Sequence, residues 1–359
     1  MKTAFITRST LFASPGGDTI QVLQTARFLR QQGIDVDILR TNDSIRYADY
    51  DLLHFLNLTR PADILFHINR CKKPFVISPI LVDYSEYDRQ HREGLAGRVL
   101  RRFSPHGNEY IKTCARWIAR RDTLQSKAFL WKGQFSSIRE IIQRAAMVLP
   151  NSISEYERLS RIYQVKKEYA VVPNGVDETM FYPGDEAQRN PRLVLCAARI
   201  EGIKNQLNLI RALNGTHFTV LMAGAPALNQ KEYYQQCRKE AANNIFFNDH
   251  LPQDQLLNLY RQARVHVLPS WFETCGLSSL EAAAMGCNLV ITDKGYTRDY
   301  FQNDAVYCHP EDPSSIHDAV VQAASQPTNK NLQDRILTQY TWRNAARLTA
   351  SAYQKILSA

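Results

Sequence analysis

Short apolar runs recur along the whole chain of 359 residues and are separated by segments with helix-like patterns. Each run is continuous rather than alternating, which is typical of strands buried on both faces of a parallel sheet. Strands that alternate with helices favour an α/β fold, and we expect two doubly wound, Rossmann-like sheets. The predicted strands are Thr3–Thr7, Val36–Leu39, Leu52–Leu56, Phe75–Ser78, Met147–Pro150, Val171–Pro173, Leu193–Ala197, Phe218–Ala223, Ile245–Phe247, Val265–Leu268 and Leu289–Thr292.

The length of the chain and one turn-rich stretch indicate two domains. Residues 173–191 are polar and rich in Pro, Gly and Asn, which makes them the best boundary. We expect an N-terminal domain over 1–170 with an insertion at 85–145, a C-terminal domain over 171–340, and a helix over 341–359 that packs back on the first domain. Because such folds bind ligands at the carboxyl ends of their strands, we expect the site in a cleft between the domains.

The net charge of +9 is concentrated in the segment from Arg89 to Arg144. This segment holds 13 Lys and Arg residues against 4 acidic ones, so the rest of the chain is neutral overall. Within it, Asn108 to Asp122 carries an apolar helical stripe that suits an interfacial helix or a lid. The excess needs an anionic partner, such as a membrane surface or a lipid-linked diphosphate, or else a solvated helical face. No nucleic-acid-binding motif is present, so we expect no nucleic acid partner.

Cysteine usage and hydropathy favour a cytoplasmic protein. The seven cysteines lack metal-ligand spacing, so we expect reduced thiols, no disulfide and no zinc site. No apolar run approaches the roughly 20 residues that span a bilayer. The chain also passes from Met1 and Lys2 into its first strand without an export signal.

The segment from Ser270 to Gly286 places two glutamates around a predicted helix start. A helix start offers N–H groups and partial positive charge to a phosphate, and Glu281 tilts toward that end, where it can accept bonds from ribose hydroxyls. Glu273, in the preceding loop, would face the group attached to the phosphates. The alternative is a capping box over Ser278–Glu281. The neighbouring Glu273 and Gly276 favour the phosphate site.

A pair of glycines follows the first strand. Gly16 and Gly17 lack Cβ atoms where backbone can approach a phosphate or sugar, and Thr19 or Asp18 can cap the next helix. A simple turn is the alternative explanation for the two glycines.

Two cations follow the strand predicted at Leu193–Ala197. Arg199 can hold a diphosphate through its forked guanidinium, and Lys204 can do so as a point charge. Taken alone, either residue would be interpreted as an ordinary solvated cation. Their position near the Glu273 loop favours a diphosphate-binding site.

Other polar and aromatic residues have structural explanations or remain candidates. His54 lies within a predicted strand and is expected to be a satisfied core residue. Trp271 and Phe272 could stack on a sugar, but aromatic residues beside a strand end are more often core, and we expect them there. Asp83, Glu86 and His91 follow the fourth strand and are candidates for contact with an acceptor.

Taken together, these segments resemble the retaining glycosyltransferase family 4, also described as glycosyl transferases group 1, which has the GT-B fold. That fold implies two Rossmann-like doubly wound domains facing a central cleft. The resemblance covers nearly the whole chain, and the order and spacing of its segments make it specific. The matching segments are Gly16-Gly17, Pro150–Ser152, Val172–Asp177, Arg199–Lys204, Glu273–Glu281, Thr292–Asp299 and Tyr340–Asn344.

The resemblance implies that the C-terminal domain holds a nucleotide-diphosphate sugar, of UDP or GDP type, and the N-terminal domain an acceptor. Arg199 and Lys204 would neutralise the leaving diphosphate and Glu273 would contact the donor sugar, which makes these three the implied catalytic residues. The base would lie near Phe247–Leu251. The other implied donor-binding residues are Gly16, Gly17, His250, Leu251, Cys275, Gly276, Leu277 and Glu281. No cofactor and no metal is implied, because protein cations and the helix end replace the metal.

One position departs from the family pattern. Many relatives carry a histidine after the fourth strand of the N-terminal domain, whereas Ile80 or a neighbour occupies that place here. Either another group replaces the histidine, with Asp83 the nearest polar candidate, or the reaction does not need one.

The sequence therefore predicts a retaining, metal-independent hexosyltransferase. It would move a sugar from a nucleotide-diphosphate sugar to a glycan or lipid-linked acceptor in surface polysaccharide, lipopolysaccharide or glycolipid synthesis. Peripheral contact with the inner face of the plasma membrane is an alternative to a purely cytoplasmic location. Two other functions stay open: a nucleotide-sugar 2-epimerase of the same fold, and a catalytically silent nucleotide-sugar-binding partner of another transferase.

Overall fold

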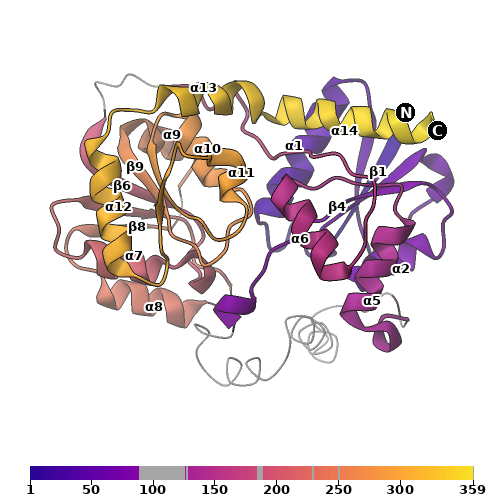
Figure 1. Ribbon diagram of the computed structural model, residues 1–359, viewed down its shortest axis with the longest axis horizontal. Coiled ribbons are helices and arrows are strands. Elements are labelled where there is room, and N and C mark those ends of the chain that lie inside the picture. The colour runs from indigo at the N-terminus through magenta and orange to yellow at the C-terminus, as the bar shows by residue number, and fades with distance from the viewer. Residues whose placement is uncertain (89–125, 127, 184–188, 229, 250, 359) are drawn as a thin grey trace. The chain divides into compact units, whose positions relative to one another are not determined.

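The computed structural model describes residues 1–88, 126, 128–183, 189–228, 230–249 and 251–358. These residues form two compact units (Figure 1). The first unit contains residues 1–81, the described part of 98–174, and 342–358. The second contains residues 82–88 and the described part of 175–341. Each unit has one parallel sheet with helices on both faces, which confirms the predicted fold class of two Rossmann-like α/β domains.

The first unit is built on a five-stranded sheet with the order β2-β1-β3-β4-β5. Its strands are β1 (Lys2–Thr7), β2 (Asp35–Arg40), β3 (Leu52–Leu56), β4 (Phe75–Ser78) and β5 (Met147–Val148). Its helices are α1 (Gly17–Gln31), η1 (Tyr47–Asp49), α2 (Pro61–Ile68), α5 (Ala128–Arg144), α6 (Ile153–Tyr163) and α14 (Trp342–Leu357).

One face of this sheet packs against α2, α5 and α6. Phe55 and Ile77 from the strands meet Leu65 of α2, Ile141 of α5 and Leu159 of α6 in one buried cluster. Helix α14 packs against α1, which places the last helix of the chain on the first unit. The predicted helix over 108–122 lies outside the described residues.

His54 connects the sheet of the first unit to α14. It lies in β3 with 2% of its surface exposed. Its Nδ1 atom is 2.6 Å from the hydroxyl of Tyr353, and its Nε2 atom is 2.8 Å from the hydroxyl of Ser78. Burial lowers the pKa of His54 to about 3, so the ring is neutral. The prediction of a satisfied core histidine is confirmed.

The second unit is built on a six-stranded sheet with the order β11-β10-β9-β6-β7-β8. Its strands are β6 (Asn190–Ala197), β7 (Thr219–Ala223), β8 (Ile245–Asn248), β9 (Ala263–Leu268), β10 (Asn288–Thr292) and β11 (Val306–Cys308). Its helices are η4 (Gly202–Lys204), α7 (Gln206–Leu213), α8 (Lys231–Glu240), α9 (Gln253–Gln262), α10 (Leu277–Ala284), α11 (Thr297–Phe301), α12 (Pro313–Ser325) and α13 (Lys330–Gln339).

Strand β6 shows why this sheet is apolar on both faces. Successive side chains of a strand point to opposite faces. Leu193 and Leu195 accordingly join the cluster formed with α9, α10 and α13, whereas Val194 and Cys196 join the cluster formed with α7, α8 and α12. Both faces must therefore be apolar, which explains the continuous runs in the sequence.

Three details differ from the sequence-based expectations. Val171–Pro173 forms no strand, because it is held by isolated contacts such as the bond from Val172 N to Pro150 O at 2.8 Å. Strand β11 was not predicted, since three residues give too short a pattern. Residues 82–88 belong to the second unit, where Val82 and Tyr87 pack against its aromatic cluster.

Tyr353→Phe tests the link between α14 and the sheet. The change leaves Nδ1 of the buried His54 without its hydroxyl partner, so the free energy of unfolding of the first unit should fall by about 1 to 3 kcal/mol. Urea denaturation followed by circular dichroism measures this. The matched control is Tyr169→Phe, because Tyr169 is exposed and its change should stay within about 0.5 kcal/mol. Equal effects of the two substitutions would contradict the assignment.

Candidate functional site

The candidate site lies where β6 and β9 of the second unit end. These strands are parallel neighbours, so their carboxyl ends meet at one edge of the sheet. Beyond β6 the chain forms η4, and beyond β9 it forms the loop that leads into α10. The N–H group of Trp271 donates to the carbonyl of Ile203 at 2.9 Å and ties the two segments together. This edge is the place where parallel α/β sheets bind ligands.

Lys204 and Glu273 form an ion pair at this edge. The Nζ atom of Lys204 is 2.6 Å from Oε2 of Glu273, and the hydroxyl of Ser270 donates to the same oxygen at 3.1 Å. Glu273 is 8% exposed. Burial disfavours the charged form of Lys204, but the Glu273 carboxylate outweighs it and raises the pKa of the ammonium. Two residues predicted from separate motifs therefore form one charged pair.

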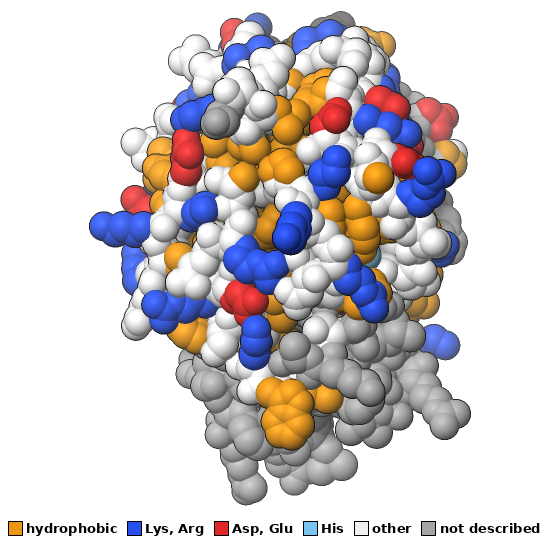
Figure 2. Space-filling model, turned by 90° about the vertical axis from the view of Figure 1, so that its right-hand side faces the viewer, with side chains coloured by type: hydrophobic (Ala, Val, Ile, Leu, Met, Phe, Trp, Pro, Cys, Tyr) orange, Lys and Arg blue, Asp and Glu red, His pale blue; other side chains and the backbone are white. Residues whose placement is uncertain are grey.

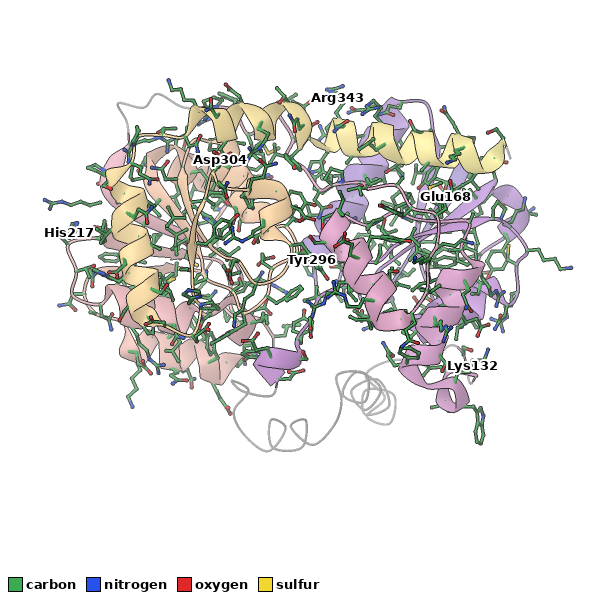
Figure 3. The ribbon with its side chains drawn as sticks, viewed as in Figure 1. Lys132, Glu168, His217, Tyr296, Asp304 and Arg343 are labelled. Atoms are coloured by element: carbon green, nitrogen blue, oxygen red, sulfur yellow. The ribbon has the colours of Figure 1, made fainter. Side chains whose placement is uncertain are left out.

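The loop that carries Glu273 is fixed against the segment after β10. The N–H group of Glu273 donates to the carbonyl of Lys294 at 3.1 Å, and Tyr296 N–H donates back to the Glu273 carbonyl at 2.9 Å. A Cβ atom on Gly295 would lie 1.9 Å from that carbonyl oxygen, so only glycine fits. Tyr296 (Figure 3) packs with Trp271 and Phe272 in a buried cluster, which confirms that the aromatic pair belongs to the core.

Helix α10 begins at the same edge. Its N-cap is Gly276 with φ +68°, Leu277 is its first residue, and no side chain caps it. The first N–H groups of a helix lack partners within the helix and favour an anion. Cys275, just before the N-cap, is 2% exposed and packs in the core.

Glu281 does not form the alternative capping box. Its Oε2 atom accepts a hydrogen bond from the Tyr260 hydroxyl at 3.0 Å. Burial raises the pKa of the Glu281 carboxyl to about 7, against the opposing effect of that bond. Tyr260 was not predicted as a partner, because the two residues belong to different helices.

Arg199 lies beyond the end of β6 with a largely accessible side chain. Its Nη2 atom is 3.1 Å from Oε1 of Glu201, and its side chain is 46% exposed. This position leaves the guanidinium accessible to a ligand at the strand edge.

A hollow of about 510 Å³ lies at the carboxyl ends of β7 and β8. Its volume falls within the range of about 300 to 1,000 Å³ of ligand pockets. Leu251, a predicted donor-binding residue, is part of its wall, whereas His250 lies outside the described residues. The lining residues are Ala223, Gly224, Ala225, Asp249, Leu251, Pro252 and Leu256.

The predicted acceptor residues are not brought together as one group. Glu86 pairs with Lys294, whose Nζ atom also lies 3.4 Å from Oε2 of Glu311. Asp83 accepts a hydrogen bond from the N–H group of Ser85 at 2.8 Å. His91 lies outside the described residues.

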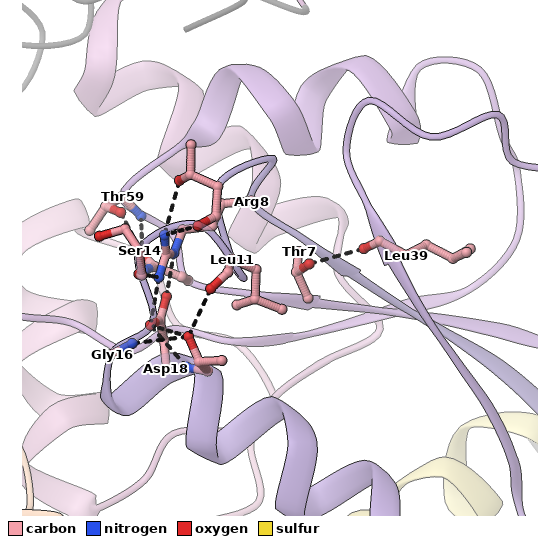
Figure 4. A network of polar contacts seen from close by, with 11 residues as sticks. Thr7, Arg8, Leu11, Ser14, Gly16, Asp18, Leu39 and Thr59 are labelled. Carbon is pink, nitrogen blue, oxygen red and sulfur yellow. Dashed lines mark hydrogen bonds and ion pairs between the residues drawn. The ribbon is translucent and has the colours of Figure 1, made fainter. Parts of the chain in front are cut away.

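The Gly16-Gly17 loop of the first unit is held by an arginine that the sequence analysis missed (Figure 4). Arg8 donates to Asp18 through Nε at 2.7 Å and to the Ser14 carbonyl at 2.8 Å. Burial raises the pKa of Asp18, but the guanidinium of Arg8 outweighs this effect and holds the pKa below its ordinary value. The N-cap of α1 is Gly16, and the predicted capping role of Thr19 is confirmed in part, because its hydroxyl accepts the N–H group of Gly16 at 3.0 Å from the third position of the helix.

The backbone turn at position 80, where the sequence departs from the pattern of the family that it resembles, is strained. Ile80 adopts φ +50°, which is rare for a β-branched residue. The buried carboxylate of Glu155 accepts the N–H groups of Leu81 at 2.6 Å and Asn151 at 2.5 Å and thereby holds the turn. No imidazole is available at position 80.

A protein-family model matches most of the second unit. The family model described as glycosyl transferases group 1 matches residues 183–339, which include the ion pair, α10 and the hollow. Residues 183–339, which make up less than half of the chain, are similar to this family. The match supports the coarse prediction of a glycosyltransferase.

Curated relatives align with part of the chain. A glycogen synthase of Mycobacterium tuberculosis is 29% identical over 199 residues, which are 52% of this chain and 48% of the relative. A D-inositol 3-phosphate glycosyltransferase of Acidothermus cellulolyticus is 28% identical over 179 residues, covering 44% of this chain and 40% of the relative. The aligned regions thus span about half or less of these curated relatives.

Solved structures share the fold over the whole chain. Sucrose-phosphate synthase from Thermosynechococcus elongatus has a TM-score of 0.76 at 16% identity, covering 100% of this chain and 99% of the other. Anabaena Alr3699/HepE in complex with UDP-glucose has a TM-score of 0.71 at 14% identity, covering 99% and 100%. These likenesses show that the chain shares the fold of these proteins.

Glu281 gives the site a testable pH dependence. Its pKa in the folded protein is raised from 4.5 to about 7, so the native state binds the proton more tightly than the unfolded state. The resulting stability is present in full below pH 4.5 and is lost as the pH rises through 7. Between pH 4.5 and about pH 8, the free energy of unfolding of the wild type should fall by about 1 to 3 kcal/mol relative to that of the Glu281→Gln variant.

Urea denaturation at a series of pH values measures this difference. Glu240 provides a control of opposite sign, because its hydrogen bond from Arg211 lowers its pKa and adds stability as the pH rises. Parallel pH profiles for wild type and Glu281→Gln would contradict the raised pKa.

Proposed function

We propose that this protein is a retaining glycosyltransferase that uses a nucleotide-diphosphate sugar. The observation that carries the proposal is the Lys204–Glu273 ion pair beside the start of α10, within the residues that match the glycosyl transferases group 1 family model. A cation and a helix start at one sheet edge suit a diphosphate, and a neighbouring carboxylate suits the attached sugar.

The donor would extend along the edge of the second unit. Its base would occupy the hollow beside Leu251, and its ribose hydroxyls would bond to Glu281. Its diphosphate would lie near Arg199, Lys204 and the first N–H groups of α10. Protein cations would then neutralise the leaving group, so we propose that transfer needs no metal.

In the proposed reaction, the bond between the anomeric carbon and the diphosphate oxygen breaks, a bond to the acceptor hydroxyl oxygen forms on the same face of the sugar, and the hydroxyl proton passes to the leaving diphosphate. The developing charge on the leaving diphosphate is stabilised by Lys204 and Arg199. Glu273, oriented by Ser270 and Lys204, would contact the sugar as positive charge develops.

The names of relatives and neighbours support this substrate class. Curated relatives include glycogen synthase and D-inositol 3-phosphate glycosyltransferase, and a structural neighbour was solved in complex with UDP-glucose. We propose a hexosyl donor and a glycan or lipid-linked acceptor, in the synthesis of a surface polysaccharide, lipopolysaccharide or glycolipid in the cytoplasm. The Gly16-Gly17 loop, held by Arg8, would contact donor or acceptor in the first unit.

We also propose that the basic segment from Arg89 to Arg144 contacts an anionic membrane surface. Most of it lies outside the described residues, but its last part forms α5. There Trp131 is 91% exposed. The next residue in the sequence is Lys132, which is labelled in Figure 3. Figure 2 shows a face on which Lys and Arg side chains lie among hydrophobic ones. An exposed indole with neighbouring cations suits a bilayer interface. Among the described residues, no helix combines the length and apolarity of a membrane span.

Transfer itself tests the proposed activity. The purified protein would be incubated in EDTA with radiolabelled nucleotide-diphosphate sugars and a panel of glycan and lipid-linked acceptors. We expect label in a glycosylated product, whose anomeric configuration, read by NMR, matches that of the donor. Hydrolysis or epimerisation of the donor with every acceptor would contradict the proposal.

Lys204→Ala should abolish most transfer. Losing one charge-stabilising group costs about 3 to 4 kcal/mol in the transition state, or a hundred- to thousand-fold in rate. Steady-state kinetics on the folded variant measures the loss. Lys231→Ala removes an exposed lysine from the start of α8 and serves as the matched control. Near-normal turnover by a folded Lys204→Ala variant would remove Lys204 from the site.

Trp131→Ala should weaken membrane binding. Flotation with vesicles of phosphatidylcholine, with and without phosphatidylglycerol, measures the bound fraction. Wild type should float with the anionic vesicles. The variant should bind them about tenfold more weakly, because it loses the apolar surface that the indole would bury in the bilayer. Tyr182→Ala, which removes an exposed aromatic from the second unit, should bind as wild type does. Equal flotation with neutral and anionic vesicles would contradict the electrostatic contribution.

A further inference from the structure

Asn205, the residue after Lys204, combines an unusual backbone conformation with a buried side chain. It ends η4 and precedes α7 with φ +60° and ψ 34°, in the left-handed region that Asn tolerates better than most residues. The residue is only 4% exposed. Its side chain therefore acts on the surrounding loops of the protein and not directly on a ligand.

The amide of Asn205 bonds to two carbonyl groups that lie beyond the ends of β9 and β11. Its Nδ2 atom donates to the Pro269 carbonyl at 3.1 Å and to the Pro310 carbonyl at 2.6 Å. An amide nitrogen carries two hydrogens, so these two bonds use its full capacity as a donor. Because both partners can only accept, a carboxylate in place of the amide would meet them with repulsion.

Two links between these loops frame Lys204 and Ser270. On one side, the carbonyl group before Lys204 accepts the N–H group of Trp271, which follows Ser270, at 2.9 Å. On the other side, the Asn205 amide donates to the carbonyl group before Ser270. Lys204 and Ser270 lie between the two links, and both bond to Oε2 of Glu273. A shift of either segment would therefore change the contact between the ammonium and the carboxylate.

The next residue fixes the other end of the same loop. Gln206 is 1% exposed, and its Nε2 atom donates to the Arg199 carbonyl at 2.9 Å. Two consecutive side-chain amides thus hold the loop that carries both cations. Asn205 holds the Lys204 end, and it alone of the two connects the loop to the segment that leads to Glu273.

We infer that Asn205 is a positioning residue for sugar transfer, whose amide holds Lys204 in register with Glu273; the inference rests on the proposed function. Electrostatic stabilisation of a transition state is strongest when the charged groups are oriented before the reaction begins. Without the amide, the loop would have to order Lys204 against the leaving diphosphate in each turnover. The loss should therefore appear in kcat more than in KM.

Steady-state kinetics of the Asn205→Gly variant tests the inference. Glycine adopts the left-handed conformation without strain, so the change removes the amide and keeps the backbone. We expect kcat to fall about ten- to hundred-fold and KM for the nucleotide-diphosphate sugar to change less than about threefold. Asn205→Asp should lose at least as much, because it keeps the size of the side chain and replaces the donors by a charged acceptor.

Asn208→Ala is the matched control. The Nδ2 atom of Asn208 donates to the same Pro310 carbonyl at 2.9 Å, so the change removes one bond to this carbonyl and leaves the link to Pro269 in place. This variant should transfer sugar as wild type does. Thermal unfolding of each variant confirms that it is folded.

A double-mutant cycle with Lys204→Ala distinguishes positioning from a merely structural role. If Asn205 acts through Lys204, the Asn205→Gly change should lower kcat by less than about threefold once the ammonium is absent. A residue that contributes only to stability would lower kcat by the same factor with and without Lys204.

The outcomes separate the inference from the proposed function. Unchanged kcat in a folded Asn205→Gly variant, or an equal loss of kcat in both backgrounds of the cycle, would overturn the positioning role and leave the proposed transfer in place. If the folded wild type transferred sugar from no nucleotide-diphosphate donor, the proposed function would fail and the inference with it.

Discussion

The contact between Lys204 and Glu273 is the interaction on which the candidate site depends. It joins the segment after β6 to the loop after β9, two parts of the chain that are 69 residues apart. Each partner is fixed by its backbone: Lys204 by η4, and Glu273 by the paired bonds to the segment after β10. The start of α10 follows in the same loop, so the ion pair and the helix start cannot move independently.

The ion pair between Lys204 and Glu273 is better explained by function than by stability. Burying two charges costs desolvation energy that their attraction often only offsets, so an apolar pair would serve stability as well. The pair instead holds an ammonium and a carboxylate at a sheet edge where a ligand can reach both. Ser270 adds a neutral donor to Glu273, and Arg199, which follows the same strand β6 as Lys204, pairs with Glu201 at 3.1 Å. The charges at this edge are those that the proposed nucleotide-diphosphate sugar requires.

The sequence predicted the architecture well, because buried parallel strands leave continuous apolar runs. The bounds of β3 and β4 agree with the prediction, whereas β11 is too short to leave such a pattern. Charged residues at strand ends were also visible as candidates, including Lys204 and Glu273. The partners of these residues were not visible, since they depend on tertiary packing.

Four contacts illustrate that limit. Glu86 and Lys294 are 208 residues apart, and Tyr260 reaches Glu281 from another helix. Asp249 lies beside a predicted base region, but its hydrogen bond from the Tyr234 hydroxyl appears only once β8 and α8 are placed. Arg8 holds its loop through carbonyl oxygens that no sequence pattern marks.

Hydrogen–deuterium exchange with and without a nucleotide-diphosphate sugar tests the central claim most directly, because it reports where the donor binds as well as whether it binds. The account predicts slower exchange in residues 199–206 and in 273–281 when a donor is bound. Protection confined to other segments, with any donor that binds, would contradict the placement of the diphosphate beside Lys204 and Glu273.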